Sequence, residues 1–142
     1  MLVRLLYASR STDAVNQDSL TAILNKSRAN NPKVGVTGVL CFSGNIFLQV
    51  LEGGRMSVNT LYNKIASDNR HRDVVILSYE EISERRFSGW SMGQVNLGLI
   101  NPSLLLKYSE FATLDPYAVS GKASLALFEE LMASAHILGQ RV

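Results

Sequence analysis

The chain has 142 residues, of which 46% are hydrophobic and 18% charged, with a formal net charge of +2. These values suit one globular domain with its own core, and the charge is too mild to favour nucleic acid or an anionic membrane as a partner. No apolar run approaches the roughly 20 residues of a membrane-spanning helix, there is no signal peptide pattern, and the lone Cys41 fits a reducing compartment, so we expect a cytoplasmic protein.

Hydrophobic periodicity predicts seven elements before residue 97. In chain order they are a strand at 2–9, a helix capped by Asn16 or Asp18 and running to about Ala29, strands at 35–42 and 45–52, a helix between 54 and 67, and strands at 74–82 and 90–95. The order β-α-β-β-α-β-β predicts an α+β fold with a ferredoxin-like sheet and one extra strand. Because crossovers are right-handed, the third strand should lie between the first and the second, with both helices on one face.

The chain after the last predicted strand indicates a helical extension, so we divide the sequence into domains at 1–97 and 98–142. A short helix is predicted at 102–107, and an amphipathic helix should begin at Ser120 and be ended by Gly139. The sheet face opposite the first two helices is too apolar to face water. We therefore expect the tail to pack under the sheet, and we expect a homo-oligomer.

Gln49 is a polar residue within an otherwise apolar strand. It shares one side of that strand with Phe47 and Leu51, and a buried amide without a partner costs roughly 1–3 kcal/mol. Tyr7, on the first strand, can point to the same face, where its phenol and the Gln49 carboxamide can satisfy each other. Two interpretations stay open: a hydrogen bond of the core, or a site at which Gln49 faces a ligand.

Other polar and aromatic residues also keep two interpretations. The triplet at 70–72, Arg-His-Arg, suits either a phosphate cradle or a solvated turn. Trp90 and Met92 stand two apart on the last predicted strand, should share a face, and are either core residues or cofactor contacts. The chain shows no metal-ligand spacing and no hydrolytic residue set. The sheet face that RNA-binding modules use lacks aromatic residues here.

Five short stretches stand out together: LLYAS at 5–9, Asn31 followed by VTGVL at 36–40, FLQVLEG at 47–53, DNRH at 68–71 and RFSGWSM at 86–92. In this order they resemble the BLUF family of blue-light sensors using flavin, and the resemblance covers about residues 2–96. It implies a non-covalently bound flavin, FAD with FMN as the alternative, held between the two helices over the sheet.

The resemblance also implies roles for individual residues. Tyr7 would donate an electron and a proton, Gln49 would bridge Tyr7 and the flavin, and Trp90 and Met92 would relay the signal. Asn31 would bind the pyrimidine edge of the ring, beside Asn30, a position where some relatives carry histidine. The cofactor-binding set is Ser9, Ile23, Asn30, Asn31, Phe47, Ile65, Arg70 and His71.

The resulting expectation is a blue-light photoreceptor that is not an enzyme and that signals to an unidentified effector or regulator protein. The alternative is a small flavin-dependent oxidoreductase, which would bleach when given a nicotinamide cofactor. A structural interaction domain would be colourless, and a phosphatase-like protein would turn over acyl phosphates with the help of Arg70. Neither nucleic acid nor a membrane is expected as a partner.

Overall fold

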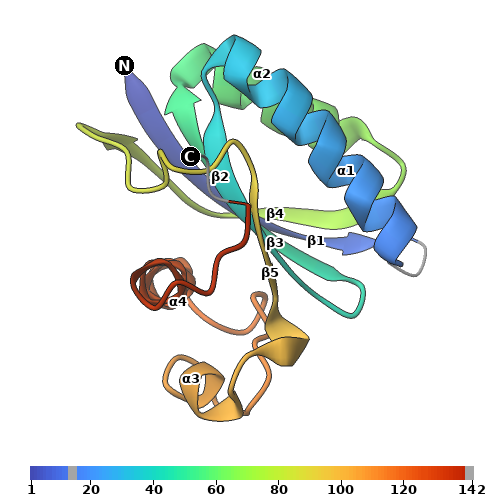
Figure 1. Ribbon diagram of the computed structural model, residues 1–142, viewed down its shortest axis with the longest axis vertical. Coiled ribbons are helices and arrows are strands. Elements are labelled where there is room, and N and C mark those ends of the chain that lie inside the picture. The colour runs from blue at the N-terminus through green and yellow to red at the C-terminus, as the bar shows by residue number, and fades with distance from the viewer. Residues whose placement is uncertain (13–15, 140–142) are drawn as a thin grey trace.

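A five-stranded sheet lies between helices in the computed structural model, which describes residues 1–12 and 16–139 (Figure 1). Its elements are β1 (Leu2–Ser11), α1 (Gln17–Asn30), a 3-10 helix (Asn31–Val34), β2 (Thr37–Ser43), β3 (Ile46–Gly54), α2 (Arg55–Ser67), β4 (His71–Ile82), β5 (Gly93–Asn96), a second 3-10 helix (Leu97–Leu99), α3 (Pro102–Leu106) and α4 (Gly121–Ala133). The predicted α+β class and order of elements are confirmed.

The strand order is β4-β1-β3-β2-β5, so β3 lies between β1 and β2, as the right-handed crossover predicts. These first four strands pair antiparallel, whereas β5 joins β2 in parallel. In the β1–β3 register Tyr7 stands directly opposite Gln49. The topology therefore brings together two residues that are 42 positions apart in the sequence.

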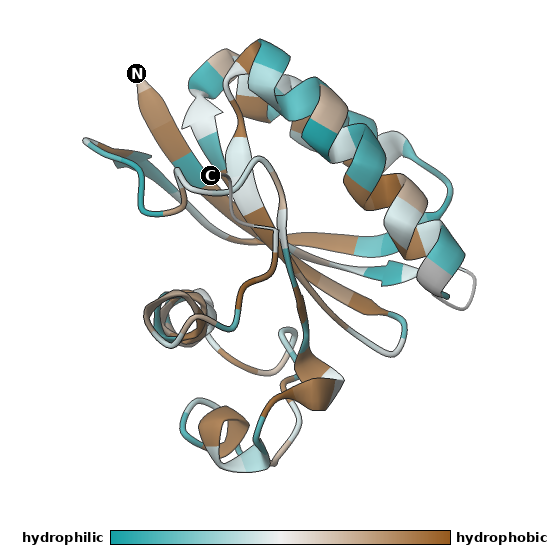
Figure 2. Ribbon diagram, viewed as in Figure 1, coloured by the Kyte–Doolittle hydropathy of each residue, from teal (hydrophilic) through white to brown (hydrophobic). Residues whose placement is uncertain are grey.

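Each face of the sheet has its own hydrophobic core. Figure 1 shows α1 and α2 over one face and the helices of the tail, α3 and α4, on the other side. Figure 2 shows mainly hydrophobic residues on the central strands, and a mixture of hydrophobic and hydrophilic residues along α1 and α2. The upper core, under α1 and α2, includes Val3, Leu5, Tyr7, Leu20, Leu24, Phe47, Leu51, Val58 and Met92. The lower core, over α4, includes Leu6, Leu48, Val50, Phe87, Trp90, Leu127, Phe128 and Leu131. The expected packing of the tail under the sheet is thus observed.

Local capping explains where α1 begins. Of the two candidate caps, Asn16 caps the helix: its Oδ1 accepts a hydrogen bond from the backbone N–H of Ser19 at 2.8 Å, and the Ser19 hydroxyl lies 3.2 Å from the Asn16 backbone N–H. After Asn30 the chain tightens into the 3-10 helix, which contains Pro32 and ends at Gly35 in the left-handed region, with φ +70°.

Three predicted boundaries are wrong by three residues or more. β4 begins at His71 rather than Val74, because pairing with β1 continues to the Ser11–His71 pair. β5 begins at Gly93 rather than Trp90, and α4 ends at Ala133 instead of running on to Gly139. The helix stops early because Ala135 adopts a left-handed conformation, with φ +59°.

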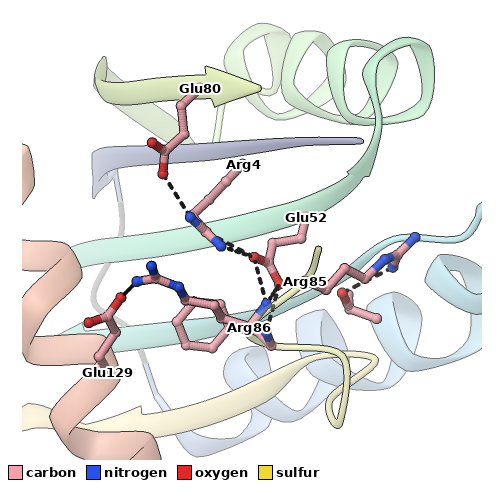
Figure 3. A network of polar contacts seen from close by, with 8 residues as sticks. Arg4, Glu52, Glu80, Arg85, Arg86 and Glu129 are labelled. Carbon is pink, nitrogen blue, oxygen red and sulfur yellow. Dashed lines mark hydrogen bonds and ion pairs between the residues drawn. The ribbon is translucent and has the colours of Figure 1, made fainter. Parts of the chain in front are cut away.

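A buried carboxylate fixes the segment that connects β4 to β5. Glu52, fully buried at the end of β3, accepts hydrogen bonds from Arg4 Nε at 2.8 Å and from the backbone N–H groups of Arg86 and Phe87, the latter at 2.7 Å. The Arg86 side chain forms an ion pair with Glu129 of α4 (Figure 3). One network therefore links the sheet, the connecting segment and the tail.

Candidate functional site

A cavity of about 730 Å³ lies between α1, α2 and the upper face of the sheet. Its size is in the range of cofactor and small-molecule sites. Of the twelve residues that sequence analysis placed in the site, ten line this cavity: Tyr7, Ile23, Asn30, Asn31, Phe47, Gln49, Ile65, Arg70, His71 and Met92.

On the floor of the cavity, three residues are joined by two polar contacts. The Tyr7 hydroxyl donates a hydrogen bond to Oε1 of Gln49, and Nε2 of Gln49 donates to the sulfur of Met92 at 3.2 Å. Burial, and then the nearby Tyr62, raise the pKa of Tyr7 well above its ordinary value, so the phenol stays protonated. Because a thioether is a weak acceptor, the Gln49 amide retains donor capacity toward the cavity.

Trp90 and Met92 do not share a face, contrary to the prediction. Met92 belongs to the upper core and lines the cavity, whereas Trp90 packs in the lower core, where its indole Nε1 has no hydrogen-bond partner among the described residues. Side chains alternate only within a regular strand, and both residues precede the start of β5 at Gly93. Met92 is therefore the member of this pair that contacts Gln49.

Ser9 stands behind the cavity wall instead of lining it. Its hydroxyl lies 3.0 Å from Nδ1 of His71, and the His71 ring packs against Phe47 with 5.6 Å between the ring centroids. Burial lowers the pKa of His71 below its ordinary value, with Asp68 opposing this shift and Arg70 adding to it. His71 is therefore neutral at pH 7 and contributes no positive charge to the cavity.

Two further polar residues that line the cavity, Asn31 and Arg70, lie just after the C-terminal ends of α1 and α2. Asn31 is buried, and its Nδ2 donates to the Ser91 carbonyl at 2.9 Å. Arg70 forms an ion pair with Asp68, with 2.6 Å between Nη2 and Oδ2. This pair leaves much of the guanidinium exposed, since 63% of the Arg70 side chain is accessible.

Sequence analysis missed two lysines that line the cavity, Lys26 on α1 and Lys64 on α2. Lys26 lies three residues after Ile23, and positions three apart share a helix face. This spacing was the available signal, but exposed lysines on amphipathic helices are so common that it did not stand out. With Arg70 they place three cationic groups around one cavity.

Neither a metal centre nor a membrane span is found in the part of the chain that the structure describes. In residues 1–12 and 16–139, no group of three or more His, Cys, Asp or Glu residues is arranged to hold a metal ion. No helix in these ranges is long and apolar enough to cross a membrane.

The cavity suits a planar, amphipathic ring with an anionic tail. Ile23 and Ile65 give it apolar walls on two facing helices, and Gln49 presents an amide from the floor. The lysines and Arg70 add cationic groups. A flavin has this combination of an aromatic ring with polar edges and a phosphate-bearing side chain, so the residues present fit this cofactor.

The fold and site together define a cofactor-binding α+β domain. Comparison with known protein families identifies the family of this domain. Residues 2–93 match the family model described as "BLUF: Sensors of blue-light using FAD", and the chain belongs to this family. The chain accordingly carries a domain of the family of flavin-based blue-light sensors, which confirms the predicted family and favours the photoreceptor over the oxidoreductase alternative. The match is to a family of sensors and not to a family of enzymes.

Three similar proteins illustrate the range of the family. The chain is 34% identical over 92 residues to photoactivated adenylate cyclase subunit beta of Euglena longa, a match that covers 64% of this chain and 11% of the cyclase. It is 32% identical over 99 residues to the blue light- and temperature-regulated antirepressor BluF of Escherichia coli K12, covering 70% of this chain and 25% of that protein. The solved structure of BlsA in its photo-activated state has a TM-score of 0.82, 31% identity and coverage of 100% of this chain and 99% of BlsA.

Proposed function

We propose that the protein binds FAD in the cavity between α1 and α2, and that it registers blue light as a rearrangement of hydrogen bonds around Gln49. The observation that carries this proposal is the direct hydrogen bond between Tyr7 and Gln49 on the cavity floor, with Met92 on the other end of the same amide. A proton donor, a reorientable amide and a packed side chain thus form one continuous chain.

In this proposal each wall of the cavity binds a different part of the cofactor. Ile23 and Ile65 pack against the ring, while Asn31 and its neighbour Asn30 offer amides to its polar edge. Phe47 completes the floor and orients His71 through their ring contact. Ser9 acts on the cofactor only indirectly, through its contact with His71.

The cationic groups favour FAD over FMN. Lys26, Lys64 and Arg70 all line the cavity together with one carboxylate, Asp68, which pairs with Arg70, and this net positive set suits a pyrophosphate better than a single phosphate. His71 is neutral, so it adds a hydrogen-bonding group and not a charge to this end of the site.

When bound, the flavin supplies blue-light absorption and a strongly oxidising excited state. Tyr7 would supply the electron and the hydroxyl proton that this chemistry needs and would recover both, so no atom would be lost and no product would leave. Gln49 has a donor end and an acceptor end, and a half-turn of its amide would exchange the group facing Tyr7 with the group facing Met92. The Gln49–Met92 hydrogen bond would then be broken, and the altered packing of Met92 carries the signal outward.

We further propose that residues 98–142 pass the signal to a separate effector or regulator protein in the cytoplasm, and that the protein is a homo-oligomer. Exposed apolar residues in this part of the chain, Leu99 and Phe111, support a role in protein contacts. Size-exclusion chromatography at several concentrations, in darkness and under blue light, tests the oligomer. A strict monomer under all conditions would contradict it.

Absorption spectroscopy of the purified protein, before and after blue light, tests the central proposal. We expect a yellow protein whose flavin bands shift slightly to the red and return in darkness. Bleaching of the flavin would instead point to ordinary reduction and an oxidoreductase. A protein that stays colourless with excess FAD would overturn the proposal and leave Gln49 as a satisfied core residue.

A further inference from the structure

The last described residues of the chain, 137–139, lie against the start of β5. The N–H of Leu138 donates to the carbonyl of Gln94 at 3.0 Å, and the N–H of Gln94 donates to the carbonyl of Leu138 at 3.1 Å. Ile137 is buried beside them, and a Cβ added to Gly93 would lie only 2.5 Å from its Cγ2 atom. The terminal segment therefore adds one antiparallel bridge to the edge of the sheet.

Arg28 of α1 holds this terminal segment and the cavity residue Met92 at the same time. Its Nε donates to the Met92 carbonyl at 3.1 Å. Its guanidinium also packs on Gly139, because a Cβ added to Gly139 would come within 2.5 Å of Nη2. Gly139 has a φ of +85°, which favours glycine for a second reason. Among the described residues no carboxylate pairs with Arg28, so its role here is to hold backbone groups.

We propose that Arg28 is a positioning residue that couples Met92 to the terminal segment 137–139. This inference rests on the proposed function, in which light changes the contact between Gln49 and Met92. The sulfur of Met92 accepts a hydrogen bond from Gln49, and the backbone carbonyl of Met92 accepts one from Arg28. A shift of Met92 would therefore move the carbonyl group to which the Arg28 guanidinium is bonded. The guanidinium in turn packs against Gly139.

The bridge between Gln94 and Leu138 is weak enough to open in response to a small shift of Met92. It consists of two backbone hydrogen bonds at one pair of residues, Gln94 and Leu138, outside any continuous strand pairing. Short, peripheral pairings of this kind open at far lower free-energy cost than the core of a sheet. Loss of the Arg28 contact should therefore release the segment while the sheet stays folded.

Hydrogen exchange of the Leu138 and Gln94 amides, measured by NMR on the FAD-loaded protein in darkness and under blue light, tests the coupling. In the unmodified protein we expect several-fold faster exchange in the light. In Arg28→Gln, exchange should already be several-fold faster in darkness, and light should add little, although the red shift of the flavin persists. Lys33→Gln, which removes a positive charge from an exposed position outside the cavity, should behave like the unmodified protein.

A second variant changes Gly139, the other residue of the contact with Arg28. Gly139→Ala places a Cβ against the guanidinium and should reproduce the effect of Arg28→Gln, which keeps the test valid if Arg28→Gln folds poorly. Unchanged dark exchange in both variants, or an undiminished response to light, would overturn the coupling. A normal red shift without any change in Leu138 exchange would also overturn it while leaving the proposed function intact, whereas a missing red shift would contradict the proposed function itself.

Discussion

Tyr7 and Gln49 face each other across the β1–β3 pair, and the Tyr7 hydroxyl donates its hydrogen bond to the Gln49 carbonyl oxygen. Both side chains are buried, with 2% and 6% of their surfaces exposed. The register therefore places the amide opposite the phenol, and the hydrogen bond to Tyr7 leaves the NH2 end of Gln49 with only the weak acceptor Met92. An amide held strongly on one side and weakly on the other is suited to reorientation.

Tyr7→Phe should keep the bound flavin but abolish the reversible red shift. The substitution removes the only transferable proton of this side chain while preserving the ring and its packing. Difference spectroscopy before and after blue light is the measurement. Tyr62→Phe is the matched control, since Tyr62 contacts the Tyr7 ring edge-on at 5.7 Å but does not line the cavity. A red shift that survives in Tyr7→Phe would contradict the mechanism.

Gln49→Leu should also abolish the red shift, and it should destabilise the protein because the Tyr7 hydroxyl loses its acceptor. An unsatisfied buried hydroxyl costs about 1–3 kcal/mol. The double variant Tyr7→Phe/Gln49→Leu replaces both partners with apolar groups. It should therefore regain most of the free energy of unfolding that Gln49→Leu alone loses. Urea unfolding of the flavin-free unmodified protein, the two single variants and the double variant measures this double-mutant cycle. Strict additivity of the two single changes would show that the hydrogen bond does not stabilise the fold.

The Tyr7–Gln49 pair could be predicted because both residues lie on regular strands, β1 and β3. Tyr7 and Gln49 could be assigned to one face because strands alternate and a right-handed crossover makes β1 and β3 neighbours. Trp90 was misplaced because the same alternation was applied before the strand begins at Gly93. The segment before that strand is held by long-range contacts, such as the hydrogen bonds that the backbone N–H groups of Arg86 and Phe87 donate to the Glu52 carboxylate, and no local pattern reveals such contacts.

Lys26→Gln and Lys64→Gln should each weaken FAD binding about two- to fivefold, as expected for exposed charge pairs. Because both lysines are exposed, the effect should shrink as ionic strength rises. Fluorescence titration with FAD and with riboflavin is the measurement. Riboflavin carries no phosphate and should bind the variants and the unmodified protein equally well. Equal losses for both ligands would mean that the lysines shape the cavity and do not bind phosphate.

The flavin-free protein should lose stability as the pH falls below about 6.5, the ordinary pKa of histidine. Burial lowers the pKa of His71, so between this lowered value and about 6.5 the unfolded chain binds a proton that the folded chain does not. Stability therefore rises with pH across that interval. His71→Gln should flatten this dependence in urea unfolding at several pH values. If the free energy of unfolding of His71→Gln depended on pH as steeply as that of the unmodified protein, His71 would not be the source of this dependence.

Glu52→Gln should be among the most destabilising single changes in the chain. The carboxylate is fully buried and partners Arg4, whose side chain is only 6% exposed, so its neutralisation leaves a buried guanidinium without its main counter-charge. Removing one partner of a buried pair costs about 3–5 kcal/mol. Glu80→Gln is the matched control, because Glu80 also pairs with Arg4 but is 47% exposed, and its loss should cost less than about 1 kcal/mol. Similar unfolding free energies for the two variants would show that Glu52 does not anchor the segment that carries Met92.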